Sequence, residues 1–360
     1  MTKVTALLHQ MGQSLWLDNI TRGLLDSGTL RRYIDELSVT GLTSNPSIFN
    51  QAIKNSTFYD AAIRQKVKDG KAGEVLFFEL AIEDLTRAAE LFRPIHERTN
   101  GLDGFVSLEV SPRLAYDTQS TLAAAQQLCA QAKRPNLFIK IPGTREGLPA
   151  IEEAIFAGVP INVTLLFSRE QYLAAAEAYL RGVERRIEAG LNPRVESVAS
   201  VFVSRWDGAV AGKISDEFRN KLGIAISGRT YKAYCDLLAS DRCHRLANYG
   251  ARMQRLLWAS TSTKNDPAAP DDLYVRALAA PYTVNTMPEQ TLLNFADHGT
   301  LGSVLSPGAG DAEELLFKMS RAGIDMDALA AQLQKDGAEA FVKSWDELMT
   351  VLEAKARLSN

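Results

Sequence analysis

The stretch LFIKIPGTREGLPAIEEAIFAGVPINVTLLF, residues 137–167, contains one complete unit of the fold. It begins with a continuously apolar run at 137–142 and ends with another at 161–167, and both have the length of strands. An Ala/Leu/Glu-rich amphipathic pattern at 145–158 lies between them and predicts a helix. Strands that are apolar at every position are covered on both faces, as in parallel sheets, whose strands need crossover helices. The stretch therefore predicts a strand–helix–strand unit with parallel strands.

Similar apolar runs recur along the chain, with helical patterns such as 120–134 and 168–190 between them. The second of these patterns opens with a capping box formed by Ser168 and Gln171. Eight runs alternating with helices over about 270 residues predict a (β/α)8 barrel, an α/β TIM-barrel fold. A doubly wound open sheet is the alternative, because a count of strands does not show closure. Against it, no G-x-G-x-x-G follows the first run and no G-x-x-x-x-G-K-[ST] occurs. The runs lie at 14–19, 41–46, 105–110, 137–142, 161–167, 197–205, 255–261 and 282–288.

The domain organisation follows from the length of 360 residues, because single α/β barrels often exceed about 200. The richest candidate linker, NDPAAPDD at 265–272, falls inside a β/α loop. We therefore expect a single barrel domain over residues 1–360. It would carry a helical insertion at about 50–100 and C-terminal helices at about 311–358.

Composition excludes several classes of function. With 40 basic and 43 acidic residues, a net charge of −3 argues against a nucleic-acid partner but leaves a local anion pocket open. The three cysteines contain no C-x-x-C pair, and the four histidines are scattered, so we expect no disulfide framework, no metal site and no Ser-His-Asp triad. No signal peptide and no apolar window of about 18 residues occurs. These features predict a cytoplasmic protein without a membrane partner.

Polar side chains late in the apolar runs, or just beyond them, mark a candidate site, because barrel enzymes carry their active sites at the C-terminal ends of the strands. An Asp or Asn after a strand commonly caps a turn or a helix. The occurrence of such residues on six of the eight runs nevertheless indicates one shared site. They are Asp18, Asn45, Glu109, Lys140, Asn162, Thr164, Ser200 and Arg205.

Lys140 is the most informative of these residues, because it stands in the middle of the apolar run at 137–142. Lysine is rarely fully buried, so a lysine inside a strand needs a partner or a function. An edge-strand lysine that reaches solvent, or a structural salt bridge, would explain it. The functional interpretation is an amine whose desolvation favours the neutral form, which attacks a carbonyl to form a Schiff base.

Schiff-base chemistry needs groups that move protons. The carboxylates of Asp18 and Glu109, on separate strands, could divide this work, and Thr164 could hold a water molecule between them. The alternatives are that Glu109 pairs with Arg113 and that Thr164 is an ordinary core residue.

Cationic and hydroxyl groups at the ends of the sixth and seventh runs point to a phosphate site. An arginine fork at Arg205, with donors from Ser260 and Lys264, would hold a terminal phosphate. For Lys264 alone, a solvated salt-bridging face is an equal alternative.

Six motifs together resemble the transaldolase family, and they follow the family's order along nearly the whole chain. The resemblance implies a cofactor-free and metal-free Schiff-base barrel of the pentose phosphate pathway. Such an enzyme transfers a dihydroxyacetone unit from sedoheptulose 7-phosphate to glyceraldehyde 3-phosphate, giving erythrose 4-phosphate and fructose 6-phosphate. The long insert after the second run is similar to that of a longer bacterial-type subfamily. The motifs are LWLDN at 15–19, GLTSNPSIF at 41–49, FVSLEVSPRLAYDT at 105–118, FIKIPGT at 138–144, INVTLLFS at 161–168 and YTVNTMPEQTL at 282–292.

The resemblance also implies roles for individual residues. Lys140 looks like the Schiff-base lysine, Asp18 like the acid/base of carbon–carbon cleavage, and Glu109 with Thr164 like the pair that positions the catalytic water. Many members of the family read A-S-F-R-N after the seventh strand, whereas this chain has the longer ASTSTKN at 259–265. Whether Lys264 replaces the family's second cationic phosphate ligand is therefore open. The remaining implied ligands are Asn45, Asn162 and Ser200 for substrate hydroxyls, with Phe202 beside them, and Arg205 and Ser260 for phosphate.

Two other functions remain open at this point. A related Schiff-base aldolase would release free dihydroxyacetone, and a barrel without turnover would only bind sugar phosphates. The second predicts a broken catalytic set, whereas all four catalytic candidates are present. We expect sugar-phosphate substrates in either case, and a monomer or a homodimer.

Overall fold

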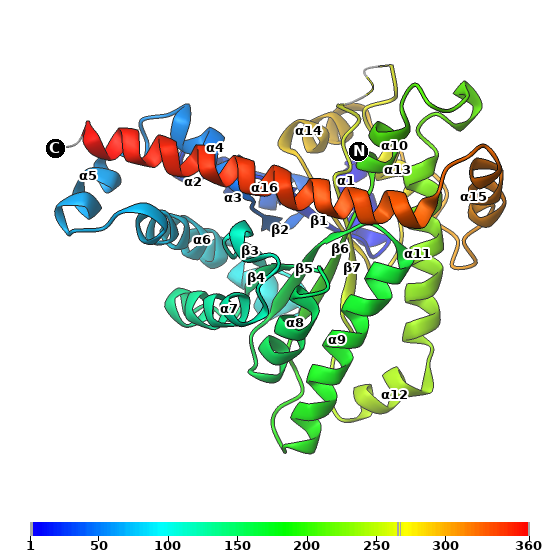
Figure 1. Ribbon diagram of the computed structural model, residues 1–360, viewed down its shortest axis with the longest axis horizontal. Coiled ribbons are helices and arrows are strands. Elements are labelled where there is room, and N and C mark those ends of the chain that lie inside the picture. Colours follow the sequence, from blue (N-terminus) through cyan, green and yellow to red (C-terminus); the bar gives the residue numbers. More distant parts are fainter. Residues whose placement is uncertain (1–2, 265, 267, 359–360) are drawn as a thin grey trace.

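A computed structural model describes residues 3–264, 266 and 268–358 (Figure 1). Its parallel strands pair in chain order, and β8 pairs with β1 to close the barrel. Closure confirms the (β/α)8 barrel and excludes the open sheet. The strands are β1 (Ser14–Asp18), β2 (Val39–Thr43), β3 (Val106–Glu109), β4 (Leu137–Pro142), β5 (Ile161–Leu166), β6 (Ser197–Phe202), β7 (Arg255–Ala259) and β8 (Val284–Met287).

Helices lie between successive strands, and several predicted ones are confirmed. The capping box of Ser168 and Gln171 is present at the start of α9 (Arg169–Glu188). The insertion after β2 contains α4 (Pro46–Lys54), α5 (Asp60–Lys68) and α6 (Gly73–Arg98). The other helices are α1 (Val4–Gln10), α2 (Arg22–Asp26), α3 (Thr29–Leu37), η1 (Pro112–Leu114), α7 (Thr118–Ala132), α8 (Gly147–Phe156), α10 (Ser204–Val210), η2 (Asp216–Phe218), α11 (Leu222–Leu238), α12 (Asp241–Asn248), α13 (Leu273–Ala277), α14 (Glu289–His298), α15 (Ala312–Arg321) and α16 (Met326–Arg357). No helix among the described residues is long and apolar enough to cross a membrane.

The interior of the barrel has a layer of apolar side chains and, next to it at the C-terminal ends of the strands, a polar layer. Side chains two positions apart on a strand face the same side. On β4, Phe138 stacks against Phe105 at a ring-centroid distance of 4.1 Å, and Lys140 follows on the same face toward the C-terminal end. On β1, Trp16 lies 6.1 Å from Phe138, and Asp18 follows it in the same way. On both strands the aromatic residue packs inside the barrel, and the residue two positions later places a polar group at the C-terminal end of the barrel.

The C-terminal helix α16 is the longest element and crosses the molecule (Figure 1). It packs against α4, α5, α6 and β5. In the N-terminal half of α16, Gln334 donates one hydrogen bond to the carbonyl of Gly143, in the loop after β4. It donates another to the carbonyl of Leu165, at the end of β5. Farther along, Asp346 pairs with Arg113 at 2.7 Å. The helix is thus held across the C-terminal end of the barrel.

Candidate active site

Lys140 and Glu109 form an ion pair inside the barrel. They are neighbours in the register of β3 and β4, and their exposed fractions are 5% and 4%. Lys140 Nζ donates to Glu109 Oε2 at 3.1 Å and to the carbonyl oxygen of Ser44 at 3.2 Å. Closure leaves no edge strand, so the edge-lysine interpretation is wrong, whereas the salt bridge exists. Arg113 pairs with Asp346 and not with Glu109.

Asp18 lies at the end of β1, and its carboxylate accepts a hydrogen bond from Thr43 Oγ1 at 2.7 Å. Thr43 Oγ1 also lies 2.7 Å from Thr286 Oγ1, so β1, β2 and β8 are joined by side chains at this level. Sequence reasoning missed both threonines, although each stands in a quoted motif two positions from another inward-facing residue.

Burial raises the pKa of both carboxyls. It raises the pKa of Asp18, against the opposing effects of Lys140, the Thr43 hydrogen bond and Lys264. It also raises the pKa of Glu109, against the attraction of Lys140. Carboxyls with a raised pKa hold a proton more readily than exposed ones, which suits groups that both accept and return protons.

Ser200 on β6 lines the site, and Asn162 on β5 lies behind it. Ser200 Oγ donates to Asn162 Oδ1 at 2.7 Å, and Asn162 Nδ2 donates to Ser107 Oγ at 3.1 Å. Thr164, also on β5, is completely buried, and its hydroxyl has no hydrogen-bond partner among the residues that the structure describes. Glu109 Oε1 is likewise buried and lacks a hydrogen-bond partner among these residues. Buried polar atoms normally have a partner, so these two atoms are suited to bind a water molecule or substrate oxygen.

Asn45 is both a helix cap and a residue of the site, the two roles that the sequence allowed. Its side chain accepts a hydrogen bond from the backbone N–H of Ile48 at 3.1 Å and so caps α4. It also lines the same cavity as Lys140. The capping role fixes the side chain at the mouth of the barrel.

Arg205 projects from α10 over the aromatic ring of Phe202, with its Cζ atom 5.1 Å from the ring centroid. The structure places no carboxylate of a described residue within ion-pair distance of it, and burial lowers the pKa of its guanidinium. Ser260 stands after β7 with a φ of 56°, and its hydroxyl lies 2.9 Å from that of Ser204. An arginine without a carboxylate partner beside hydroxyl donors can receive an external anion.

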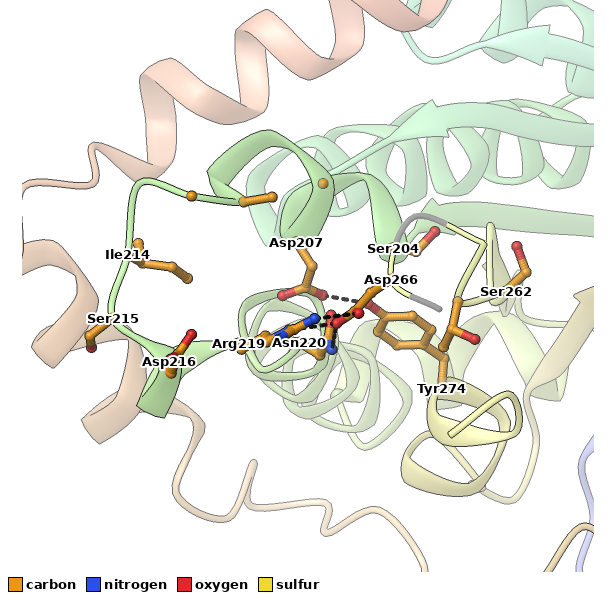
Figure 2. Close-up of a pocket in the computed structure, with 14 residues that line it drawn as sticks. Ser204, Asp207, Ile214, Ser215, Asp216, Arg219, Asn220, Ser262, Asp266 and Tyr274 are labelled. Atoms are coloured by element: carbon orange, nitrogen blue, oxygen red, sulfur yellow. Dashed lines mark hydrogen bonds and ion pairs between the residues drawn. The ribbon is translucent and has the colours of Figure 1, made fainter. Parts of the chain in front are cut away.

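Lys264 is exposed at the rim of the same cavity, and its charge favours the ionised form of Asp18. The loop that carries it borders a second cavity of about 240 Å³ (Figure 2). There Asp266 accepts hydrogen bonds from Arg219 Nε at 2.7 Å and from Asn220 at 2.6 Å. Asp207 accepts from Tyr274 at 2.8 Å. The hydrogen bonds of Asp266 therefore attach the loop that follows Lys264 to the segment around Arg219, beside the second cavity.

The predicted residues surround one cavity of about 250 Å³. Glu109 and Asn162 are outside its lining but contact the lining residues Lys140 and Ser200. Phe341 of α16 also lines the cavity and was not predicted. Among the described residues, no three His, Cys, Asp or Glu side chains are grouped so as to hold a metal ion. The predicted residues that line the cavity are Asp18, Asn45, Lys140, Thr164, Ser200, Phe202, Arg205, Ser260 and Lys264.

The chain is similar to known proteins over nearly its whole length. A family model described as Transaldolase/Fructose-6-phosphate aldolase matches residues 15–352. A transaldolase of Arthrobacter sp. is 42% identical over 98% of this chain and 97% of its own length. A transaldolase of Saccharopolyspora erythraea is 44% identical over 95% and 94%, and a transaldolase 2 of Nostoc sp. is 39% identical over 98% and 97%. The chain belongs to the transaldolase/fructose-6-phosphate aldolase family.

Proposed function

We propose that this transaldolase-family enzyme moves a dihydroxyacetone unit between sugar phosphates through a Schiff base on Lys140. The donor is a ketose phosphate such as sedoheptulose 7-phosphate, and the acceptor is glyceraldehyde 3-phosphate. The observation that carries the proposal is the buried Lys140–Glu109 pair, which faces a cavity that also contains Asp18. The reaction belongs to the pentose phosphate pathway.

The first half of the reaction forms the imine. Glu109, 3.1 Å from Lys140 Nζ, takes a proton from the ammonium, directly or through a water molecule held with the Thr164 hydroxyl. The neutral amine then adds to the C2 carbonyl of the ketose, and the carbinolamine loses its oxygen as water after protonation. Glu109 returns the proton taken from the ammonium to the carbinolamine hydroxyl, which leaves as water. Thr164 is suited to hold that water, because its hydroxyl and Glu109 Oε1 are buried without a hydrogen-bond partner among the described residues.

The second half breaks the carbon–carbon bond. Asp18 removes the proton of the C4 hydroxyl, the C3–C4 bond breaks, and its electron pair moves into the iminium to give an enamine. The aldose phosphate leaves. The enamine carbon then attacks the aldehyde carbon of the acceptor, and Asp18 returns its proton to the new hydroxyl. Water finally releases the ketose product from Lys140.

The remaining side chains bind the substrate. Asn45, Asn162 and Ser200 contact hydroxyls of the three-carbon unit, beside the Phe202 ring. Arg205 and Ser260 bind the phosphate, and Lys264 adds a second cation from the rim. The phosphate role of Arg205 is supported by its position in the cavity, beside the Phe202 ring and without a carboxylate partner among the described residues. We also infer that the chain is one domain, because its last helix supplies a wall of the cavity.

Reduction of the imine tests the proposal. Borohydride added with fructose 6-phosphate is expected to attach a three-carbon adduct to Lys140, located by peptide mapping. Lys140→Arg is expected to abolish adduct and turnover, because a guanidinium stays protonated and is no nucleophile near neutral pH. A label on another lysine, or normal activity of this variant, would contradict the assignment. Product analysis with and without an acceptor separates transfer from aldol cleavage, in which free dihydroxyacetone is released.

A further inference from the structure

The inference concerns Phe341, an aromatic side chain that α16 brings to the mouth of the barrel. Its exposed fraction is 6%, and it lines the cavity that contains Lys140 and Arg205. Arg205 Cζ lies 5.9 Å from the centroid of the Phe341 ring, and Lys140 Nζ lies 5.6 Å from it. One ring therefore lies within cation–π range of both cations.

The contacts of Arg205 show what holds its side chain in place. The Phe202 ring, 5.1 Å away, lies on β6, while the Phe341 ring belongs to the C-terminal helix. A Cβ atom at Gly337 of α16 would come within 3.1 Å of Arg205 Nη1, so the backbone of that helix passes close to the guanidinium. Asp336 and Glu109 attract the arginine charge, but neither lies within ion-pair distance. Arg205 is therefore positioned by aromatic and backbone contacts, which leave its N–H donors for an anion.

The helix is itself fixed at this point. Gln334, two turns before Phe341, donates to the carbonyls of Gly143 and Leu165 at 3.0 and 2.9 Å. Ser344, just beyond Phe341, accepts a hydrogen bond from Ser47 at 2.7 Å. The Phe341 ring is thus anchored on both sides along the helix.

We propose that Phe341 is a positioning residue that holds Arg205 in the orientation that receives the substrate phosphate, and thereby sets the preference for phosphorylated sugars. This rests on the phosphate role proposed for Arg205. The ring also lies near Lys140 Nζ, but that contact is the same for phosphorylated and unphosphorylated sugars. An effect of the ring on the preference between them therefore passes through Arg205. Replacing the ring keeps the catalytic groups but loosens the guanidinium, so the loss falls on phosphorylated substrates.

The experiment compares kcat/KM for fructose 6-phosphate with that for fructose, together with inhibition by inorganic phosphate. A cation–π contact corresponds to about a 2- to 30-fold change in binding. Phe341→Leu is therefore expected to lower the preference for fructose 6-phosphate, and to weaken inhibition by phosphate, by a factor in that range. Phe295→Leu, a buried aromatic on α14 away from the cavity, is the matched control, expected to lower Tm without changing the preference.

A double-mutant cycle shows whether the effect passes through Arg205. In an Arg205→Ala background, Phe341→Leu is expected to leave the phosphate preference unchanged. An equal loss in both backgrounds, or no loss with Arg205 present, would overturn the inference. If Arg205→Ala alone leaves the preference intact, the proposed phosphate site fails and the inference fails with it. Phe341→Met, whose flexible side chain fills irregular core space, replaces Phe341→Leu if the latter does not fold.

Gly337→Ala is an independent test, because its Cβ would lie 3.1 Å from Arg205 Nη1 and 2.9 Å from Leu165 Cδ2. The variant is expected to displace the guanidinium and lower the same preference. Gly308→Ala is the matched control, since its Cβ would meet only a serine hydroxyl at 3.6 Å. Unchanged preference in folded Gly337→Ala would contradict the role of α16.

Discussion

The substitution Asp18→Asn separates the two halves of the proposed reaction. A general base contributes about 10²- to 10⁴-fold to a rate, which corresponds to about 3–5 kcal/mol of barrier. The amide oxygen can still accept the hydrogen bond that Thr43 donates at 2.7 Å, so the local geometry is kept. Lys140 and Glu109, on other strands, still form the imine. We therefore expect the borohydride-trapped adduct at a near-normal rate but carbon–carbon cleavage slowed by that factor.

The measurement is a rapid-quench experiment with fructose 6-phosphate. One series is trapped with borohydride and reports imine formation, and the other reports release of glyceraldehyde 3-phosphate. Glu109→Gln is the matched control on the neighbouring carboxylate. If Asp18→Asn formed the adduct slowly but cleaved it at the normal rate, the roles of the two carboxylates would be reversed.

Asp18→Asn is expected to increase the stability of the fold at neutral pH although it lowers the activity. Burial raises the folded-state pKa of Asp18 above its ordinary value of 3.8, so between these two pKa values the folded protein binds more protons than the unfolded chain. The stability contribution of Asp18 is therefore fully present below pH 3.8 and is lost as pH rises through the folded pKa. At pH 7 a neutral amide avoids that loss, and Asp18→Asn should be more stable than the parent in urea. The gain should shrink toward pH 4, and a gain that grows on acidification would refute the reasoning.

Four further substitutions test other parts of the site and the barrel. Glu109→Gln is expected to slow imine formation itself, which borohydride trapping measures. Arg205→Ala and Lys264→Ala should each raise KM for fructose 6-phosphate about 10- to 150-fold, the value of a charge-assisted hydrogen bond, and leave dihydroxyacetone as a donor largely unaffected. An unchanged KM in Lys264→Ala would show that the longer loop carries this lysine away from the phosphate. Gly41→Ala should lower the free energy of unfolding in urea by about 1–3 kcal/mol, because its Cβ would lie 2.6 Å from the Phe105 carbonyl oxygen and 2.7 Å from the Trp16 ring.

The strands could be predicted from the sequence because each is apolar at consecutive positions and is bounded by polar or turn residues. The boundaries were less certain: β2 begins at Val39, before the run at 41–46, because its first residues pair with β1. Closure could not be predicted, since it depends on the pairing of β1 with β8, whose residues are far apart in the chain.

The candidate site could be predicted where a polar residue interrupts an apolar strand, as Lys140 does. Phe341 could not be predicted as a site residue, because an aromatic residue on an amphipathic helix usually packs in the core. Only the path of α16 brings it to the barrel. Thr43 was missed for a related reason, since a β-branched residue in a strand needs no special explanation. The residues that sequence reasoning misses are therefore those whose type suits their secondary structure.

The buried pair of Lys140 and Glu109 is the feature that the fold itself does not require. Withdrawing each ion from water costs several kcal/mol, and apolar side chains of similar volume would fill the barrel without that cost. The pair is also incomplete as a structural ion pair, because Glu109 Oε1 is buried without a partner in the described part of the chain. A salt bridge retained for stability would be expected to satisfy its second oxygen. Because Lys140 instead lines a cavity with Asp18 and Thr164, the charges of the pair are best explained by a reaction in which protons move to and from the lysine.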